Sequence, residues 1–239
     1  MSDPGFQLLY EEGPCLVVLK PAGVQTQAPP QFESLETRIK TFLKEREGKT
    51  GNIYLGVPHR LDRPVSGAMV FARHVRAAQR LSKQFERREV QKIYWALVEG
   101  IVDPPEGTWR DTLWKVHGQP LSQVVDSSHP QGQPAVLHYR TLGAGPHGSW
   151  LEIELETGRT HQVRVQAASR GHAILGDAQY GSQVAFGPVC EEPRQRAIAL
   201  HGRRLSFAHP MTRAPVSIEA PLPTAWPDLG IGPYRVTQP

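Results

Sequence analysis

The sequence predicts an α+β fold built on a mostly antiparallel mixed sheet, and three observations lead to this prediction. Apolar runs too short for helices recur at residues 15–19, 68–72 and 91–100. Residues 150–156 alternate leucine or isoleucine with glutamate, which is the pattern of a strand with one face in water. Two segments between these runs repeat apolar residues at spacings of three and four, which indicates amphipathic helices.

The first half of the chain alternates strands and helices. The strand at 15–19 ends at a Lys-Pro-Ala-Gly turn, and Ser34 is expected to cap a helix from about Leu35 to Glu47. The strand at 68–72 leads into a second helix with Ala78, Leu81 and Phe85 on one side. Residues 91–100 are apolar on both faces, so this strand is expected in the middle of a sheet.

The second half reads mostly as strands and turns. Residues 101–134 are rich in Pro, Gly, Ser and Gln, which predicts exposed connections around one short strand. Thr160 can cap a helix that continues to about Arg170. The remaining strands are expected at 108–113, 135–142, 150–156, 204–208 and 215–220.

Positive charge is concentrated in two stretches, although the net charge is only +4. The stretch 194–213 has arginines and no acid, and 73–92 is strongly basic. Within the latter, five cations are expected on the helix face opposite the apolar side: Arg73, Arg76, Arg80, Lys83 and Arg87. Such a ridge suits an RNA backbone, and the alternative is an ordinary solvated helix face.

Length and composition exclude several classes of protein. The 239 residues suffice for one large domain or two small ones. No apolar run is long enough to cross a bilayer, and the N-terminus lacks the features of a signal peptide. Cys15 and Cys190 have no CxxC spacing, so no disulfide framework is indicated. We therefore expect a cytoplasmic protein without a membrane partner.

The segment His59-Arg60-Leu61-Asp62-Arg63-Pro64-Val65 places one carboxylate between two guanidinium groups. Both arginines favour the ionised carboxylate of Asp62. Pro64 and the following Ser-Gly break regular structure, so Asp62 belongs on a shaped loop directly before a buried strand. A rigidly held carboxylate is a candidate catalyst, whereas the plainer interpretation is an aspartate that caps a turn.

Other chemistries lack their motifs. The ten histidines form no HExxH or comparable ligand pair, so no metal is expected. Neither a GxxxxGK nor a GxGxxG loop occurs, so no nucleotide cofactor is expected. Ser66 lacks the GxSxG elbow of acyl-transfer enzymes.

Six blocks of the chain occur in the order and approximate spacing of one enzyme family. They are KPAG (20–23), HRLDRPVSG (59–67), KIYWALVEG (92–100), TGRTHQVRV (157–165), GDAQYG (176–181) and LHGRRLSFAHP (200–210). In these blocks the chain resembles the RluA-like family of RNA pseudouridine synthases. The resemblance implies a pseudouridine-synthase-like catalytic domain with flanking helices and a central basic cleft.

The resemblance also implies roles for individual residues. Asp62 would be the catalytic aspartate, Tyr94 would stack on the target base or take part in proton transfer, and Arg164 would pair with Asp62. Arg60 would help to flip or replace the extracted uridine. Arg159 and His161 match the same motif as Arg164 and are expected to bind substrate.

Two features depart from many relatives. Val65 stands where the family usually has threonine, which bears on substrate details and leaves the aspartate in place. Because KPAG begins at Lys20, we expect residues 1–239 to form a single catalytic domain without a separate N-terminal RNA-binding module, and to act as a monomer.

The predicted function is isomerisation of uridine to pseudouridine in structured ribosomal or transfer RNA. The carboxylate could attack the anomeric carbon, attack the base ring, or abstract a neighbouring ribose proton, and each route needs it ionised. The main alternative is an RNA-binding or RNA-remodelling protein without catalysis. A glycosidase would need a second carboxylate, and Glu99 and Asp177 are not obvious partners.

Overall fold

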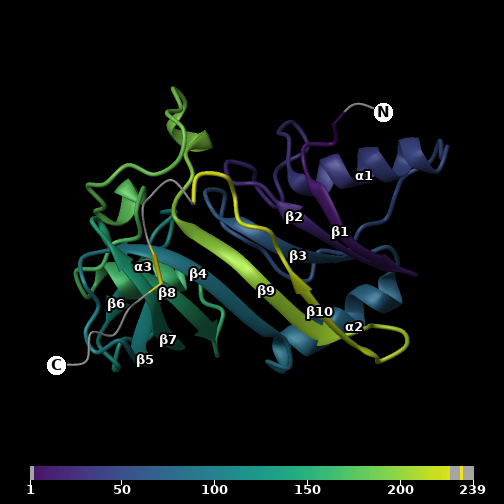
Figure 1. Cartoon of the computed structure of the whole chain (residues 1–239). Coiled ribbons are helices and arrows are strands. Elements are labelled where there is room, and N and C mark those ends of the chain that lie inside the picture. The colour runs from purple at the N-terminus through teal and green to yellow at the C-terminus, as the bar shows by residue number, and fades with distance from the viewer. Residues whose placement is uncertain (1–2, 227–231, 234–239) are drawn as a thin grey trace. The chain divides into compact units, whose positions relative to one another are not determined.

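The protein has an α+β fold, and the prediction of fold class is confirmed (Figure 1). It is a computed structural model that describes residues 3–226 and 232–233. Two compact units make up this part: residues 3–92, 190–196 and 202–222 form the first unit, and the remaining described residues form the second. The sheet is mixed and mostly antiparallel: the pairs β1–β2, β2–β3, β9–β10, β4–β8, β7–β8, β5–β7, β5–β6 and β7–β11 are all antiparallel. A single catalytic domain with a central basic cleft stays a prediction.

The first unit contains a sheet in the order β1–β2–β3–β9, with β10 paired to β9. β3 is buried along its whole length and β2 along most of it, because apolar side chains cover both faces. The segment after the Asp62 loop is therefore the buried strand that the sequence predicts. The strands are β1 (Gln7–Glu12), β2 (Cys15–Lys20), β3 (Ser66–Ala72), β9 (Leu200–Ala208) and β10 (Pro215–Glu219).

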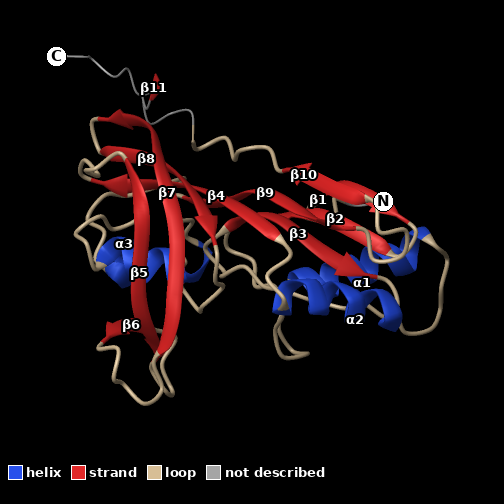
Figure 2. Ribbon diagram, turned by 90° about the horizontal axis from the view of Figure 1, so that it is seen from below, coloured by secondary structure: helices blue, strands red, loops and turns tan. Residues whose placement is uncertain are grey.

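Helix α2 (Val75–Glu86) lies against β3 (Figure 2). Its buried residues Ala77 and Leu81 join a core that includes Val17, Val70 and Phe207. The His74 side chain caps the helix by accepting a hydrogen bond of 3.1 Å from the Ala77 N–H. Because this face is buried, the opposite face of α2 carries its charges into solvent.

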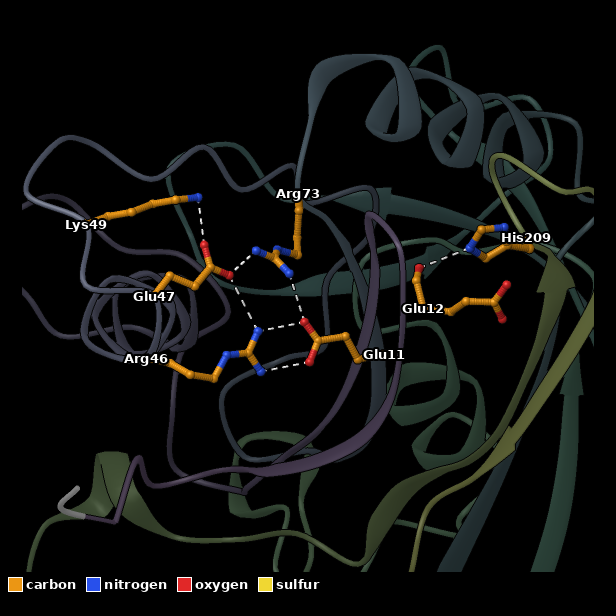
Figure 3. A network of polar contacts seen from close by, with 7 residues as sticks. All are labelled: Glu11, Glu12, Arg46, Glu47, Lys49, Arg73 and His209. Atoms are coloured by element: carbon orange, nitrogen blue, oxygen red, sulfur yellow. Dashed lines mark hydrogen bonds and ion pairs between the residues drawn. The ribbon is translucent and has the colours of Figure 1, made fainter.

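Helix α1 (Leu35–Arg46) starts at Ser34, as predicted, and a reciprocal capping box joins Ser34 to Thr37. At its other end Arg46 holds Glu11 of β1 through two hydrogen bonds of 2.7 and 2.6 Å. Arg73 contacts both Glu11 and Glu47 in the same network (Figure 3). Hydrogen bonding from Arg46 lowers the pKa of the Glu11 carboxyl, so the network stays ionised at neutral pH.

The second unit contains strands in the order β4–β8–β7–β5–β6, with β11 paired to β7. Figure 2 shows the long strands β5 and β7 side by side, with α3 (Gln162–Ala168) near them. Leu113, Ala135 and Val165 form a small core under this helix, and Tyr180 packs against it. The strands are β4 (Gln91–Glu99), β5 (Glu106–Lys115), β6 (Ser122–Val125), β7 (Gln133–Gly145), β8 (Gly148–Leu155) and β11 (Gly232–Pro233). One-turn helices are η1 (Ala178–Tyr180) and η2 (Pro193–Gln195), the latter in the first unit.

The predicted helix is present as α3, but the expected Thr160 cap is wrong. His161 is the N-cap of α3, in the left-handed region at φ 54°, and its side chain makes no capping bond. Instead, Gln162 Oε1 accepts hydrogen bonds from the Thr157 hydroxyl at 2.8 Å and the Arg159 N–H at 3.0 Å. The glutamine side chain thus satisfies the polar groups of this turn, and α3 ends earlier, at Ala168.

The region from 101 to 134 is more regular than predicted. β5 spans ten residues, and β6 pairs with it between Thr112 and Lys115. β1 was also absent from the sequence prediction, and it lies at the outer end of the strand order in the first unit. Both missed strands are short, mix polar with apolar residues and are partly exposed, so their apolar signal is weak.

Candidate active site

Asp62 lies at the start of a turn that leads into β3. The Val65 N–H donates a hydrogen bond of 3.1 Å to the Asp62 carbonyl, which closes a turn over Arg63 and Pro64. Leu61 and Val65 on either side are buried, while Asp62 itself is half-buried. We call residues 59–65 the Asp62 loop. The carboxylate is therefore carried between two buried anchors.

Lys20 anchors this loop from the end of β2. Its ammonium donates hydrogen bonds to the carbonyl oxygens of Pro21 at 2.9 Å, Arg63 at 3.2 Å and Val65 at 2.7 Å. The residue is fully buried, at 0% exposure. Three carbonyl acceptors match the three N–H donors of an ammonium group. The charged form of Lys20 therefore holds the backbone on the C-terminal side of Asp62.

The electrostatic environment of Lys20 includes Asp62. Burial lowers the pKa of Lys20 from 10.5 to about 7, the Asp62 carboxylate opposes this shift, and the Arg63 guanidinium adds to it. The Asp62 carboxylate therefore favours the charged form of the buried Lys20. Arg63 also meets the side-chain amide of Gln25, with Nε 3.2 Å from the amide oxygen.

Gly23 and Thr26 hold the same loop from the segment that follows Lys20. The Gly23 N–H donates to the Arg63 carbonyl at 2.8 Å. The buried Thr26 hydroxyl donates to the Leu61 carbonyl at 2.9 Å and accepts from the Leu61 N–H at 3.3 Å. The KPAG block and the HRLD block therefore form one structural unit around Asp62.

Two further contacts position the base of the loop. Gly67 has φ 140°, and a Cβ atom there would lie 2.4 Å from the Gly202 nitrogen, so only glycine permits this approach of β3 and β9. His59 Nε2 accepts a hydrogen bond of 3.1 Å from the Val70 N–H. Burial, with a smaller effect of the Lys92 charge, lowers the pKa of His59 to about 3, so the ring acts as a neutral acceptor.

Arg164 lies on α3 in the second unit, where it forms a buried ion pair with Asp177. Arg164 Nε donates to Asp177 Oδ2 at 2.6 Å and Nη2 donates to Oδ1 at 2.8 Å. The two side chains are 3% and 2% exposed, and Gln179 Oε1 accepts a further bond of 2.8 Å. This bidentate pair fixes the plane of the guanidinium group. Its pairing with Asp62 stays a prediction.

Tyr180 connects two of the predicted site residues. Its hydroxyl lies 2.8 Å from His161 Nδ1, and the Arg164 guanidinium lies 4.9 Å from its ring centroid. The same hydroxyl accepts a hydrogen bond of 2.9 Å from the Ser122 N–H at the start of β6. His161, Arg164 and Tyr180 therefore form one polar cluster, in which β6 also takes part.

Three predicted site residues remain: Tyr94, predicted as catalytic, and Arg159 and Arg60, predicted to bind substrate. Tyr94 is on β4, half-buried and paired with Ile153. Arg159 precedes α3, and its Nε donates to the Pro134 carbonyl at 3.0 Å. Arg60 is exposed in the Asp62 loop.

The predicted RNA-backbone residues do not form one ridge. Arg73 precedes α2 and is paired with Glu11 and Glu47, so its placement on the helix face was wrong. Arg80 donates to the Pro210 carbonyl at 2.8 Å. The three that remain in solvent are Arg76, Lys83 and Arg87.

Four residues that position the site were not among the predicted site residues: Lys20, Thr26, Asp177 and Tyr180. Three of them lie in the KPAG and GDAQYG blocks. The sequence therefore identified these segments as shared with the family, but it did not show which residues they contact. Within residues 3–226 and 232–233, no group of three or more His, Cys, Asp or Glu side chains could hold a metal ion. None of the helices in this part of the chain is long and apolar enough to cross a bilayer.

Comparison with known proteins agrees with this arrangement. Residues 14–169 match the model of the RNA pseudouridylate synthase family. The ribosomal large subunit pseudouridine synthase D of Pseudomonas aeruginosa is 33% identical over 233 residues, which cover 93% of this chain and 70% of the relative. An uncharacterized RNA pseudouridine synthase of Zymomonas mobilis is 31% identical, and the match covers 94% of this chain and 97% of the relative.

A solved structure shares the fold. Human RNA pseudouridylate synthase domain containing 4 superposes with a TM-score of 0.76 at 22% identity, and the match covers 96% of this chain and 95% of that one. The chain belongs to the RNA pseudouridylate synthase family. It is accordingly an isomerase that acts on RNA, and a binding protein without catalysis is not favoured.

Proposed function

We propose that Asp62 is the catalytic residue of this RNA pseudouridine synthase and that its substrate is a uridine of large-subunit ribosomal RNA. The observation that carries the assignment is the anchoring of the Asp62 loop by Lys20, Gly23 and Thr26. A carboxylate that must meet one sugar or base atom needs a rigid support of this kind. The choice of RNA is supported by relatives named for the large ribosomal subunit.

The reaction exchanges bonds within one nucleotide. The C1′–N1 glycosidic bond breaks, the uracil rotates, and a C1′–C5 bond forms, while C5 loses a proton and N1 gains one. Atoms and electrons balance without an oxidant or a second substrate. Three first steps remain open for Asp62: attack at C1′, attack at the base ring, or abstraction of a ribose proton. Each requires the ionised carboxylate.

The other proposed roles follow the residues' positions. Tyr94 stacks on the uracil or moves a proton, and Arg164 pairs with Asp62 from a guanidinium already oriented by Asp177. Arg60, being exposed, can enter the space that the flipped uridine leaves. Arg159 and His161 bind the flanking RNA. The exposed cations Arg76, Lys83 and Arg87 contact phosphates.

We also propose that the protein acts as a monomeric, single catalytic domain in the cytoplasm. The test is a map of pseudouridines in ribosomal and transfer RNA from a strain lacking this protein. One or more missing sites in large-subunit RNA, restored by the parent gene and not by an Asp62→Asn gene, support the proposal. Loss confined to transfer RNA would contradict the substrate, and no loss in any RNA would contradict the activity.

A further inference from the structure

A pocket of about 320 Å³ lies in the second unit, between the ends of β5 and β7 and the loop before α3. Residues from these segments line it, including Trp114, Lys115, Ser122, Gln131, Gln133 and Arg159. Its volume is at the lower end of the range for ligand pockets, about 300–1,000 Å³. A pocket of this size accommodates a ligand no larger than about one nucleotide.

The charge of the pocket has one sign. Lys115 and Arg159 are cations at its rim, and none of the described residues that line it is acidic. An anionic group is therefore favoured there by both cations. Gln131 and Gln133 add amide groups, which can hydrogen-bond to a base edge.

The aromatic and cationic groups are held in place by the protein itself. The Trp114 indole N–H donates to Gln131 Oε1 at 2.9 Å, and its ring lies 5.0 Å from the His129 ring. The Arg159 side chain is fixed by its bond to the Pro134 carbonyl, and its backbone N–H by Gln162. An indole face and a guanidinium that are already ordered lose little entropy when they bind a ligand.

We propose that this pocket binds an unstacked nucleotide of the substrate RNA, with its base against Trp114 and its phosphate between Lys115 and Arg159. The proposal rests on the proposed function, because an enzyme that extracts a uridine must open the surrounding RNA and gains by holding a second displaced nucleotide. Aromatic faces beside cations are the usual chemistry of single-stranded RNA sites. Trp114 and Lys115 lie outside the six sequence blocks, whereas Arg159 lies within one of them.

The test uses the full chain and total RNA from a strain lacking it. Initial rates of pseudouridine formation and filter-binding affinity are measured for Trp114→Leu, Lys115→Gln and Trp114→Phe. The control Lys44→Gln removes the same charge from an exposed position on α1. We expect Trp114→Leu to raise KM and Kd by about fivefold or more with kcat unchanged, since stacking on one base supplies at least this much affinity. Trp114→Phe should retain most of the affinity of the parent, because phenylalanine can also stack on a base. Lys115→Gln should reduce the slope of log Kd against log salt by about 0.7.

Unchanged KM and Kd in Trp114→Leu, or an effect of Lys44→Gln equal to that of Lys115→Gln, would overturn the pocket. If Trp114→Leu fails to fold, Lys115→Gln decides against the Lys44→Gln control, because both lysines are exposed and their replacement removes no buried group. Failure of the proposed function has a different signature. The parent would then form no pseudouridine in any RNA, while the binding measurements would still report on the pocket.

Discussion

Replacing Lys20 with methionine removes the anchor of the Asp62 loop and leaves a side chain of similar length. Three buried carbonyl groups lose their donor, at a cost of about 1–3 kcal/mol each. The variant also no longer buries an ammonium, and the fall of the Lys20 pKa from 10.5 to about 7 corresponds to about 5 kcal/mol. The two effects oppose one another, so we expect a net destabilisation of no more than about 4 kcal/mol at pH 7.

Catalysis should suffer far more than stability. The backbone at Arg63 and Val65 would move once its donor is gone, and a displacement of about 1 Å at the reacting carboxylate costs about 100-fold in rate. The assay is pseudouridine formation in RNA from a strain lacking the protein, with urea unfolding measured on the same samples. Lys44→Met, an exposed lysine of α1, is the matched control. A Lys20→Met enzyme with kcat within about threefold of the parent would refute positioning by this lysine.

The same lysine predicts a pH dependence with a definite sign. Below about pH 7 Lys20 is protonated in both the folded and the unfolded chain, so the cost of burying its charge is fully present. Between about 7 and 10.5 the unfolded chain binds a proton that the folded chain lacks, so the parent gains stability as pH rises, at up to about 1.4 kcal/mol per pH unit. Lys20→Met lacks this gain. A constant stability difference between the two proteins across this range would contradict the assignment.

Three further outcomes are expected. Asp177→Asn removes the Asp177 charge from the buried ion pair with Arg164 and should destabilise the chain by about 3–5 kcal/mol in urea unfolding; a change below about 1 kcal/mol would contradict the pair. Replacing Arg76, Lys83 and Arg87 together with glutamine should flatten the dependence of log Kd on log salt by about 0.7–0.9 per phosphate contact, with melting temperature unchanged, whereas parallel lines would mark these cations as solvated surface. Activity should survive exhaustive chelation, since the sequence offers no metal-ligand spacing; recovery of lost activity on adding zinc or magnesium would contradict this.

The buried strands and the first helix could be predicted because their signals are local. β3 is a continuous apolar run, and Ser34 with the apolar spacing after it defines the start of α1. β6 could not be predicted, because it is only four residues long, with two polar residues followed by two valines, and shows no clear alternation. His161 adopts a left-handed conformation in a turn whose polar groups bond to the Gln162 side chain. Helix propensities of single residues do not predict such a side-chain contact.

In the candidate site, too, local motifs could be recognised from the sequence, whereas the contacts between distant segments could not. The HRLD block identified Asp62 as an unusual carboxylate, and the order of six blocks identified the family. The anchoring by Lys20 was hidden, because its acceptors are backbone carbonyls that carry no sequence signal. A lysine before Pro-Ala-Gly reads as an exposed turn residue, and only the fold shows that it is buried. Likewise, the spacing of Arg73 relative to Arg76 suggested a shared helix face, while the network with Glu11 and Glu47 depends on β1 and the end of α1, which are distant in the sequence.

The central claim is that the Asp62 carboxylate performs the isomerisation, and Asp62→Asn tests it most directly. The amide is nearly isosteric and lacks the anionic oxygen that each of the three routes requires. Pseudouridine formation is measured in RNA from a strain lacking the protein, alongside RNA affinity and melting temperature. We predict that affinity and melting temperature stay close to those of the parent while no pseudouridine forms; turnover within about tenfold of the parent would contradict the role of Asp62.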